Sequence, residues 1–127
     1  MTESIQWDMG VSIVGIDANR DGVRDDIERW IDLSGLPAAQ HRALTRAAKA
    51  MQAVLAVDHS DAVATRAVAY SYRLARKCAT DALISFSTLN ALESYMINTS
   101  ARAAAYDRYK EILGTSGSAA PQAVGCS

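Results

Sequence analysis

The sequence predicts an all-α fold, a small antiparallel bundle of four to five helices preceded by an extended N-terminal segment. Apolar residues recur at three- and four-residue steps over most of residues 23–113, the spacing of one helix face. Short breaks containing Gly, Pro, Ser or Asn divide that stretch, and short connections favour antiparallel neighbours. With 127 residues, the chain is long enough for one domain with a real core.

The first helix is expected to begin near Val23 and to end at Ser34–Gly35, where glycine suits the left-handed position after a helix. One apolar face is formed by Val23, Ile27, Trp30 and Ile31. The pairs Arg24 with Glu28 and Asp25 with Arg29 are four residues apart and are expected on the solvent side.

Pro37 is expected to open the second helix, because proline fits the first helical turn. Its core stripe is Leu44, Ala48, Met51 and Leu55. The segment 58–60 breaks it, and Ser60 is the expected N-cap of a third helix. The stripe of that third helix is Val63, Ala67, Tyr70, Leu74 and Cys78.

A fourth helix is expected from about Asp81, nearly continuous with the third. Its inward residues would be Leu83, Phe86, Leu89, Leu92 and Met96. After a break at 98–100, a fifth helix near 101–113 has Ala105, Tyr109 and Ile112 as its stripe and ends at Gly114. The expected organisation is a domain over 1–114, with an extended segment at 1–16, followed by a flexible tail at 115–127.

The stretch 17–28 carries the clearest chemical pattern. Oxygen-bearing side chains stand at its positions 1, 3, 5, 9 and 12, and position 6 is Gly22. A hard cation such as Ca²⁺ needs about six to eight oxygen ligands, so a short loop must turn every second side chain inward. The expected ligands are Asp17, Asn19, Asp21, the backbone carbonyl of Val23, Asp25 and Glu28.

This spacing resembles the EF-hand calcium loop, and the Asp-x-Asn-x-Asp-Gly run leading directly into a helix is similar to dockerin-type variants of secreted bacterial proteins. The resemblance implies calcium, not a particular partner. The chain departs from the EF-hand pattern in two ways, because no entering helix precedes the loop and position 8 is Arg24 where an apolar residue is usual. No second such loop occurs in the sequence.

An alternative interpretation needs no metal. Asp21 would cap the first helix, and Asp25, Asp26 and Glu28 would stand in its first turns to suit the helix dipole. This interpretation gives Asp17 and Asn19 no role. If the helix began early and turned Asp25 away, Asp26 would be the substitute ligand.

The two cysteines bear on location. Cys78 falls in a predicted helix and Cys126 in the tail, and a disulfide between them would hold the tail on the bundle. In the chain-entropy model, closing a loop of this size stabilises by about 4 kcal/mol. Disulfides favour a periplasmic or secreted location, with any signal peptide already removed. The alternative is a buried thiol at 78 and an incidental one at 126.

Several functional classes lack support. A formal net charge of −1 without a polybasic run gives no electrostatic case for nucleic acid, and no apolar run is long enough to span a membrane. The only histidines, His41 and His59, stand in no catalytic or zinc-binding motif, so no enzyme is expected.

Protein binding is the remaining class. If the basic faces of the second and third helices adjoin, they form a patch for an acidic partner, and tyrosines at 70, 72, 95, 106 and 109 could anchor an interface. The alternative is that the basic faces are ordinary solvent-exposed surface and that the tyrosines are half-buried parts of the core. The sequence favours a non-enzymatic, extracytoplasmic calcium-binding protein with a protein partner, an inhibitor or immunity-type protein against a secreted toxin. The second hypothesis is a calcium-responsive regulatory or cell-envelope accessory subunit.

Overall fold

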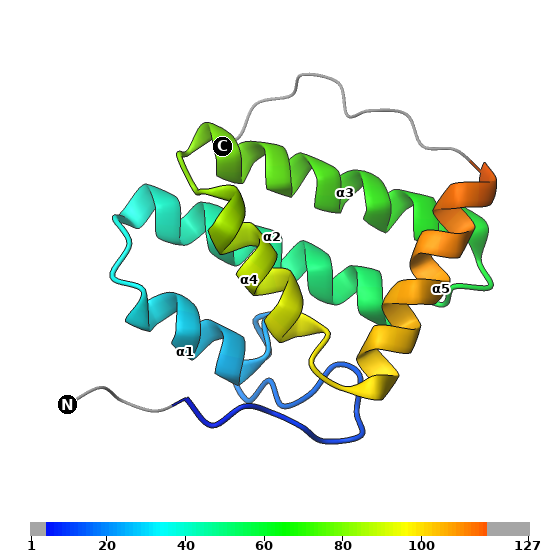
Figure 1. The fold of residues 1–127 in the computed structure, drawn as a ribbon, viewed down its shortest axis with the longest axis horizontal. Helices are drawn as coiled ribbons and strands as arrows, with labels where there is room; N and C mark the ends of the chain where they lie inside the picture. The colour runs from blue at the N-terminus through cyan, green and yellow to red at the C-terminus, as the bar shows by residue number, and fades with distance from the viewer. Residues whose placement is uncertain (1–4, 117–127) are drawn as a thin grey trace.

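The computed structural model describes residues 5–116, with side chains through Gly114. In that range the protein has five helices and no strand, which confirms the all-α prediction. The helices are α1 (Asp25–Leu33), α2 (Ala38–Ala56), α3 (Ala62–Asp81), α4 (Phe86–Met96) and α5 (Ser100–Ser116). Before α1, the chain runs without regular structure past the ends of α1, α4 and α5 (Figure 1).

The central helix is α2, which contacts each of the other four helices. Its most extensive packing is against α3, and the two helices lie side by side over most of their length (Figure 1). The predicted stripe of α2 is confirmed, because Leu44, Ala48, Met51 and Leu55 are all buried. Ile27 and Ile31 on α1 and Val23 just before it are buried as predicted, and Trp30 is partly buried against the same core.

The predicted stripe of α3 is wrong. Val63, Ala67 and Tyr70 are exposed, Leu74 is only partly buried, and Cys78 alone of the five is buried. The buried face of α3 instead consists of small residues and one tyrosine: Thr65, Ala69, Tyr72, Ala75, Cys78 and Ala79. Alanine allows two helices to approach closely, so close packing against α2 outweighed the burial of larger side chains elsewhere on α3.

The boundaries also differ in places. The N-cap of α3 is Asp61, whose carboxylate accepts the N–H of Ala64, whereas the predicted cap, Ser60, donates to Asp58. Residues 82–85 separate α3 from α4, with Leu83 at φ 72. Leu83 and Phe86 are therefore exposed, while Leu89, Leu92 and Met96 are buried as predicted.

The fifth helix begins and packs much as predicted. The hydroxyl of Thr99 accepts the N–H of Arg102, and Ala105 and Tyr109 are buried. Ile112 is partly buried, and the helix continues two residues beyond Gly114, to Ser116. At the other end of the bundle, α1 ends before Gly35, which takes the expected positive φ of 65°.

Candidate metal centre

The loop 17–28 wraps around the side chain of Asp17. The Asp17 carboxylate accepts the backbone N–H of Asp21 at 3.3 Å and that of Gly22 at 2.9 Å. Gly22 has φ 85°, a backbone conformation that glycine adopts without a steric penalty. Position 6 of the loop therefore makes the sharp turn that its sequence predicts.

The end of the loop is tied to its beginning. Asp25, at loop position 9, is the first residue of α1 and donates its N–H to the carbonyl of Ile16 at 2.8 Å. The Asp25 carboxylate in turn accepts the N–H of Ala18 at 3.1 and 3.3 Å. These bonds close the loop at the start of the helix.

Three oxygen-bearing side chains face one another across the loop. The Asn19 amide donates to both carboxylate oxygens of Glu28, at 3.3 and 3.4 Å. Burial and the nearby carboxylate of Asp21 raise the pKa of Glu28. The backbone N–H of Val23 lowers the pKa of Asp21, so Asp21 keeps its charge close to Glu28.

The alternative in which Asp21 caps the helix does not hold. The N-cap of α1 is Arg24, which makes no side-chain capping bond, and Asp21 instead accepts the N–H of Val23 inside the loop. Asp25, Asp26 and Glu28 do stand in the first turn of α1, as helix-dipole stabilisation requires. Asp26 is not placed as a substitute ligand, because it is buried and paired with Arg24.

The donor chemistry fits a hard cation better than the present arrangement of the side chains does. Within residues 5–116, no group of three or more His, Cys, Asp or Glu side chains is gathered closely enough to hold a metal ion. Calcium would require the Asn19 amide to turn its oxygen, in place of its nitrogen, toward Glu28. The backbone turn at Gly22 and the facing of Asn19, Asp21 and Glu28 are already in place, so the rearrangement would consist of side-chain rotations.

Behind the loop lies a buried network that the sequence did not predict. Arg24 was expected on the solvent side but is 1% exposed. Its guanidinium forms a bidentate pair with Asp26, at 2.6 and 2.8 Å. It also donates to the carbonyls of Tyr95 and Met96, at the C-terminal end of α4, which favours positive charge. The signal in the sequence was the basic residue at loop position 8, where an apolar one is usual.

A second buried arginine, Arg102 on α5, holds the N-terminal strap, which we define as residues 8–16. Its guanidinium donates to the carbonyls of Ile13 at 3.1 Å and Ser12 at 2.9 Å, and to that of Asp8. Burial and the neighbouring charge of Arg24 lower the pKa of Arg102. The Asp8 backbone N–H donates to Asp26 at 2.8 Å, so the two arginine sites form one continuous network.

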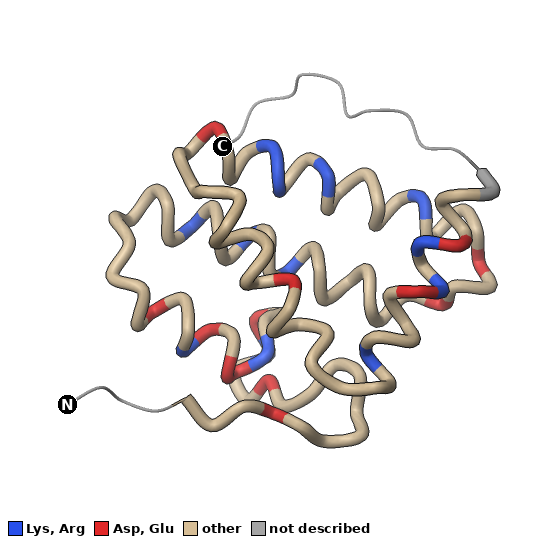
Figure 2. The backbone as a smooth tube through the Cα atoms, in the orientation of Figure 1, with Lys and Arg blue, Asp and Glu red and all other residues tan. Residues whose placement is uncertain are grey.

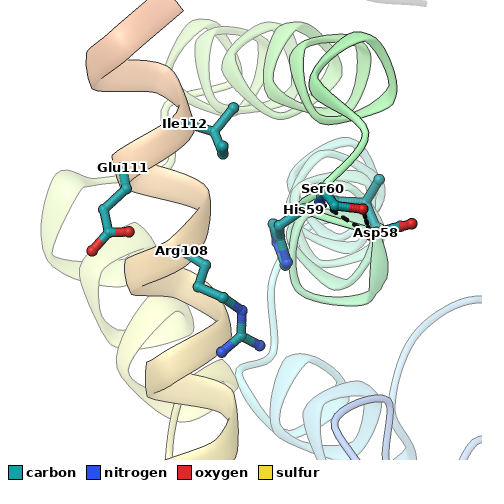
Figure 3. Close-up of a pocket in the computed structure, with 7 residues that line it drawn as sticks. Asp58, His59, Ser60, Arg108, Glu111 and Ile112 are labelled. Carbon is teal, nitrogen blue, oxygen red and sulfur yellow. Dashed lines mark hydrogen bonds between the residues drawn. The ribbon is translucent and has the colours of Figure 1, made fainter.

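A shallow cavity of about 520 Å³ lies between the α2–α3 turn and α5. Figure 3 shows Asp58, His59 and Ser60 on the turn, with Arg108 and Ile112 across from them. The Ser60 hydroxyl donates to Asp58 at 2.6 Å, and His59 Nε2 contacts the Val54 carbonyl at 2.9 Å. In this arrangement, the Ser60 hydroxyl is directed to Asp58 and not to the His59 ring.

The basic side chains of α2 and α3 have different surroundings. Arg76 on α3 points to α4, where it pairs with Glu93 at 3.1 Å, and Lys77 pairs with Asp81. On α2, Arg42 and Arg46 line two adjacent hollows. Of the tyrosines, Tyr72 and Tyr109 are buried in the core, and Tyr70 is exposed.

The predicted disulfide falls partly outside the described residues. Cys78 is buried on α3, but Cys126 and the rest of the tail beyond residue 116 are not described. The pairing stays a prediction. None of the helices in the described range is long and apolar enough to cross a bilayer.

Comparison of the chain with protein-family models, with curated proteins and with solved structures gives no match. The functional argument therefore comes from the site itself.

Proposed function

We propose that this protein binds one Ca²⁺ ion in the loop 17–28 and acts, without catalysis, by binding another protein outside the cytoplasm. The observation that carries the metal part is the loop geometry: its backbone wraps around Asp17 while Asn19, Asp21 and Glu28 face one another. Carboxylates held this close repel one another, and a cation between them would relieve the repulsion. An inhibitor or immunity-type role against a secreted toxin fits a small helical protein of this kind.

Different residues of the loop would supply the calcium ligands and hold the loop in shape. Asp17, Asn19, Asp21 and Glu28 would supply side-chain oxygens, Val23 its carbonyl, and Asp25 would act directly or through water. Gly22 and the bonds from Asp17 hold the turn, and the Asp25–Ala18 and Asp25–Ile16 bonds keep both ends of the loop together. A single loop without a paired second loop fits the weak affinities of extracellular modules, with Kd of about 10⁻⁴–10⁻³ M.

Isothermal titration calorimetry of chelator-stripped protein tests the metal part. Wild type is expected to bind one Ca²⁺, and Asp17→Asn and Glu28→Gln are each expected to weaken binding at least about tenfold, because each removes a charged ligand. Asp32→Asn is the matched control, since Asp32 is a carboxylate on the same helix outside the loop. An equal loss of calcium affinity in Asp32→Asn would indicate a general effect of negative charge. Absence of calcium binding by the wild-type protein would refute the proposal.

A calcium-responsive accessory subunit is the second candidate. It is favoured by the bonds that join the loop to the strap, since the Asp25 N–H donates to Ile16 and the Gln52 amide donates to Val14. Capture of a purified candidate partner, with and without calcium, separates the two roles. A partner held equally in calcium and in chelator favours the inhibitor role, and a partner held only in one condition favours the responsive subunit.

A further inference from the structure

The N-terminal strap presents apolar side chains to solvent. Met9, Val11, Val14 and Ile16 are all exposed, Val11 almost completely, at 97%. Apolar residues scattered singly on a surface need no explanation, but four within eight consecutive residues form a concentrated patch. Such patches on ordered segments are typical of interaction sites.

The exposure is enforced by the fold. Arg102 holds the strap through the carbonyls of Asp8, Ser12 and Ile13, and Asp8 bonds the N–H of Ile16 at 2.8 Å and that of Gly10 at 3.0 Å. These bonds fix the backbone at both ends of the strap. The apolar side chains therefore cannot fold inward without breaking a buried ionic network, which is costly.

A cavity of about 510 Å³ opens beside this patch, between the strap and the first turn of α1. Trp7, Met9 and Ile16 give it apolar walls, and Asp25 stands at its acidic side. Trp7 is held in place by stacking on Tyr95, with ring centroids 4.3 Å apart. Apolar walls with a carboxylate at one side suit the apolar stem and charged head of a Lys or Arg side chain.

The charge around the cavity supports the same occupant. Asp8 and Asp26 also line it, but each is paired with a buried arginine, so they contribute little net charge. No cation within the described residues pairs with Asp25, whose carboxylate accepts only the Ala18 N–H. More widely, residues 5–33 contain seven acidic and three basic side chains, a net charge of −4. Figure 2 shows the acidic residues of this part along the strap, the loop and α1.

We infer that the strap and its cavity are the partner-binding surface, and that the partner is a protein segment with apolar residues flanking a Lys or Arg whose side chain enters the cavity toward Asp25. The inference deepens the protein-binding half of the proposed function and does not depend on calcium. It also reverses the charge expected of the partner, from an acidic surface on the helices to a basic segment on the strap.

The test is an NMR titration of ¹⁵N-labelled protein in chelator with the peptide acetyl-Leu-Arg-Leu-amide. A second peptide carries citrulline, the neutral isostere of arginine, in place of Arg. The arginine peptide is expected to give saturable shifts at residues 7–10, 16 and 25, and to bind about three- to fivefold more tightly than the citrulline peptide, the range of a surface ion pair. Asp25→Asn is expected to remove that preference, and Ile16→Ser to weaken both peptides.

Two controls match these variants. Asp32→Asn changes a carboxylate on α1 outside the cavity, and Val63→Ser changes an exposed apolar residue on α3, so neither is expected to alter binding. No saturable shift at about 10 mM peptide, equal binding of the two peptides, or shifts centred on α2 and α3 would each overturn the inference. So would sedimentation with phosphatidylcholine vesicles in place of peptide binding, since the patch would then contact lipid. Because the titration contains chelator, failure of calcium binding would leave its outcome unaffected.

Discussion

At the scale of single residues, the structure depends on two arginines that are buried and fully paired. Arg24 pairs with Asp26 and Arg102 with Asp8, and both also donate to backbone carbonyls of other segments. No side-chain polar atom that is buried within the described residues lacks a hydrogen-bond partner. A charge of this kind is tolerated only while its partners remain, so removing one side of a pair is much more damaging than replacing both.

Replacing Arg24 by Met is expected to destabilise the protein by about 3–5 kcal/mol, because the buried Asp26 carboxylate loses its partner. The double variant Arg24→Met with Asp26→Leu is expected to recover most of that loss. Urea unfolding measures both free energies. The control Arg42→Met removes an exposed arginine of α2 and should change stability by less than about 0.5 kcal/mol. If Arg24→Met changed the free energy of unfolding by no more than Arg42→Met does, the buried pair would not contribute to stability.

The Asp8 carboxylate gives a pH dependence with a definite sign. Burial opposes ionisation, but the N–H groups of Ile16 and Gly10 and the charge of Arg102 together lower the pKa of Asp8. A lowered pKa stabilises the folded protein above the unfolded-state pKa of about 4, and this contribution is lost as the pH falls through the folded-state value. Asp8→Asn should therefore be less stable than wild type at pH 7, with a difference that narrows below pH 4. A difference that stayed constant down to pH 2 would contradict this assignment.

At the scale of elements, the sequence predicted helices better than it predicted their faces. Where large apolar residues alternate with polar ones, as on α1 and α2, the buried stripe was predicted correctly. On α3, alanines occur on several sides, and the pattern could not show which alanine face packs against α2. The end of α3 was also missed, because the positive φ of Leu83 lies outside the range that most residues adopt and leaves no sequence signal.

The strap depends on one close approach of its backbone. Gly15 has φ 69°, and a Cβ added there would lie 2.5 Å from Arg24 Cδ and 2.6 Å from an Asp8 carboxylate oxygen. Gly15→Ala should therefore displace the strap and lower stability by about 1–3 kcal/mol, as strained positions do. Gly114→Ala is the matched control, since nothing lies within 4 Å of its Cβ position in α5. It should leave the melting temperature unchanged or slightly higher. Equal effects in both variants would show that the strap is not held as described.

At the scale of the whole molecule, opposite charges lie in different parts of the chain. Residues 5–33 carry a net charge of −4, and residues 34–116, with ten basic and six acidic side chains, carry +4. The formal net charge of −1 conceals this division. Figure 2 shows basic residues along α2 and α3 and acidic ones on the strap, loop and α1. The acidic side chains of this part lie mainly in the loop and on α1.

The candidate site was predictable as far as its motif extends. The spacing from Asp17 to Glu28 indicated a turn at Gly22, and the structure has this turn. Asn19 also lies opposite Glu28, but it presents its amide nitrogen and not the ligand oxygen that the motif indicated. The buried arginine network behind the loop was not predictable, because the spacing of Arg24 and Glu28, four residues apart, is typical of a surface pair on a helix. Only the packing of α4 and the strap against α1 makes Arg24 an interior residue.

The proposed link between the tail and the bundle is tested by thiol titration of denatured, non-reduced protein. If Cys78 and Cys126 form a disulfide, no thiol should react before reduction and two should react after it. Two reactive thiols in the non-reduced sample would contradict the disulfide and weaken the case for a periplasmic or secreted location.

The most direct test of the calcium site is a crystal structure of the protein grown with calcium chloride, with anomalous scattering used to locate the ion. The expected result is an anomalous peak among Asp17, Asn19, Asp21 and Glu28, with about seven oxygens, one of them the Val23 carbonyl, at about 2.3–2.6 Å. Ordered water alone between these side chains, at a calcium concentration well above about 10⁻³ M, would contradict the proposed calcium site.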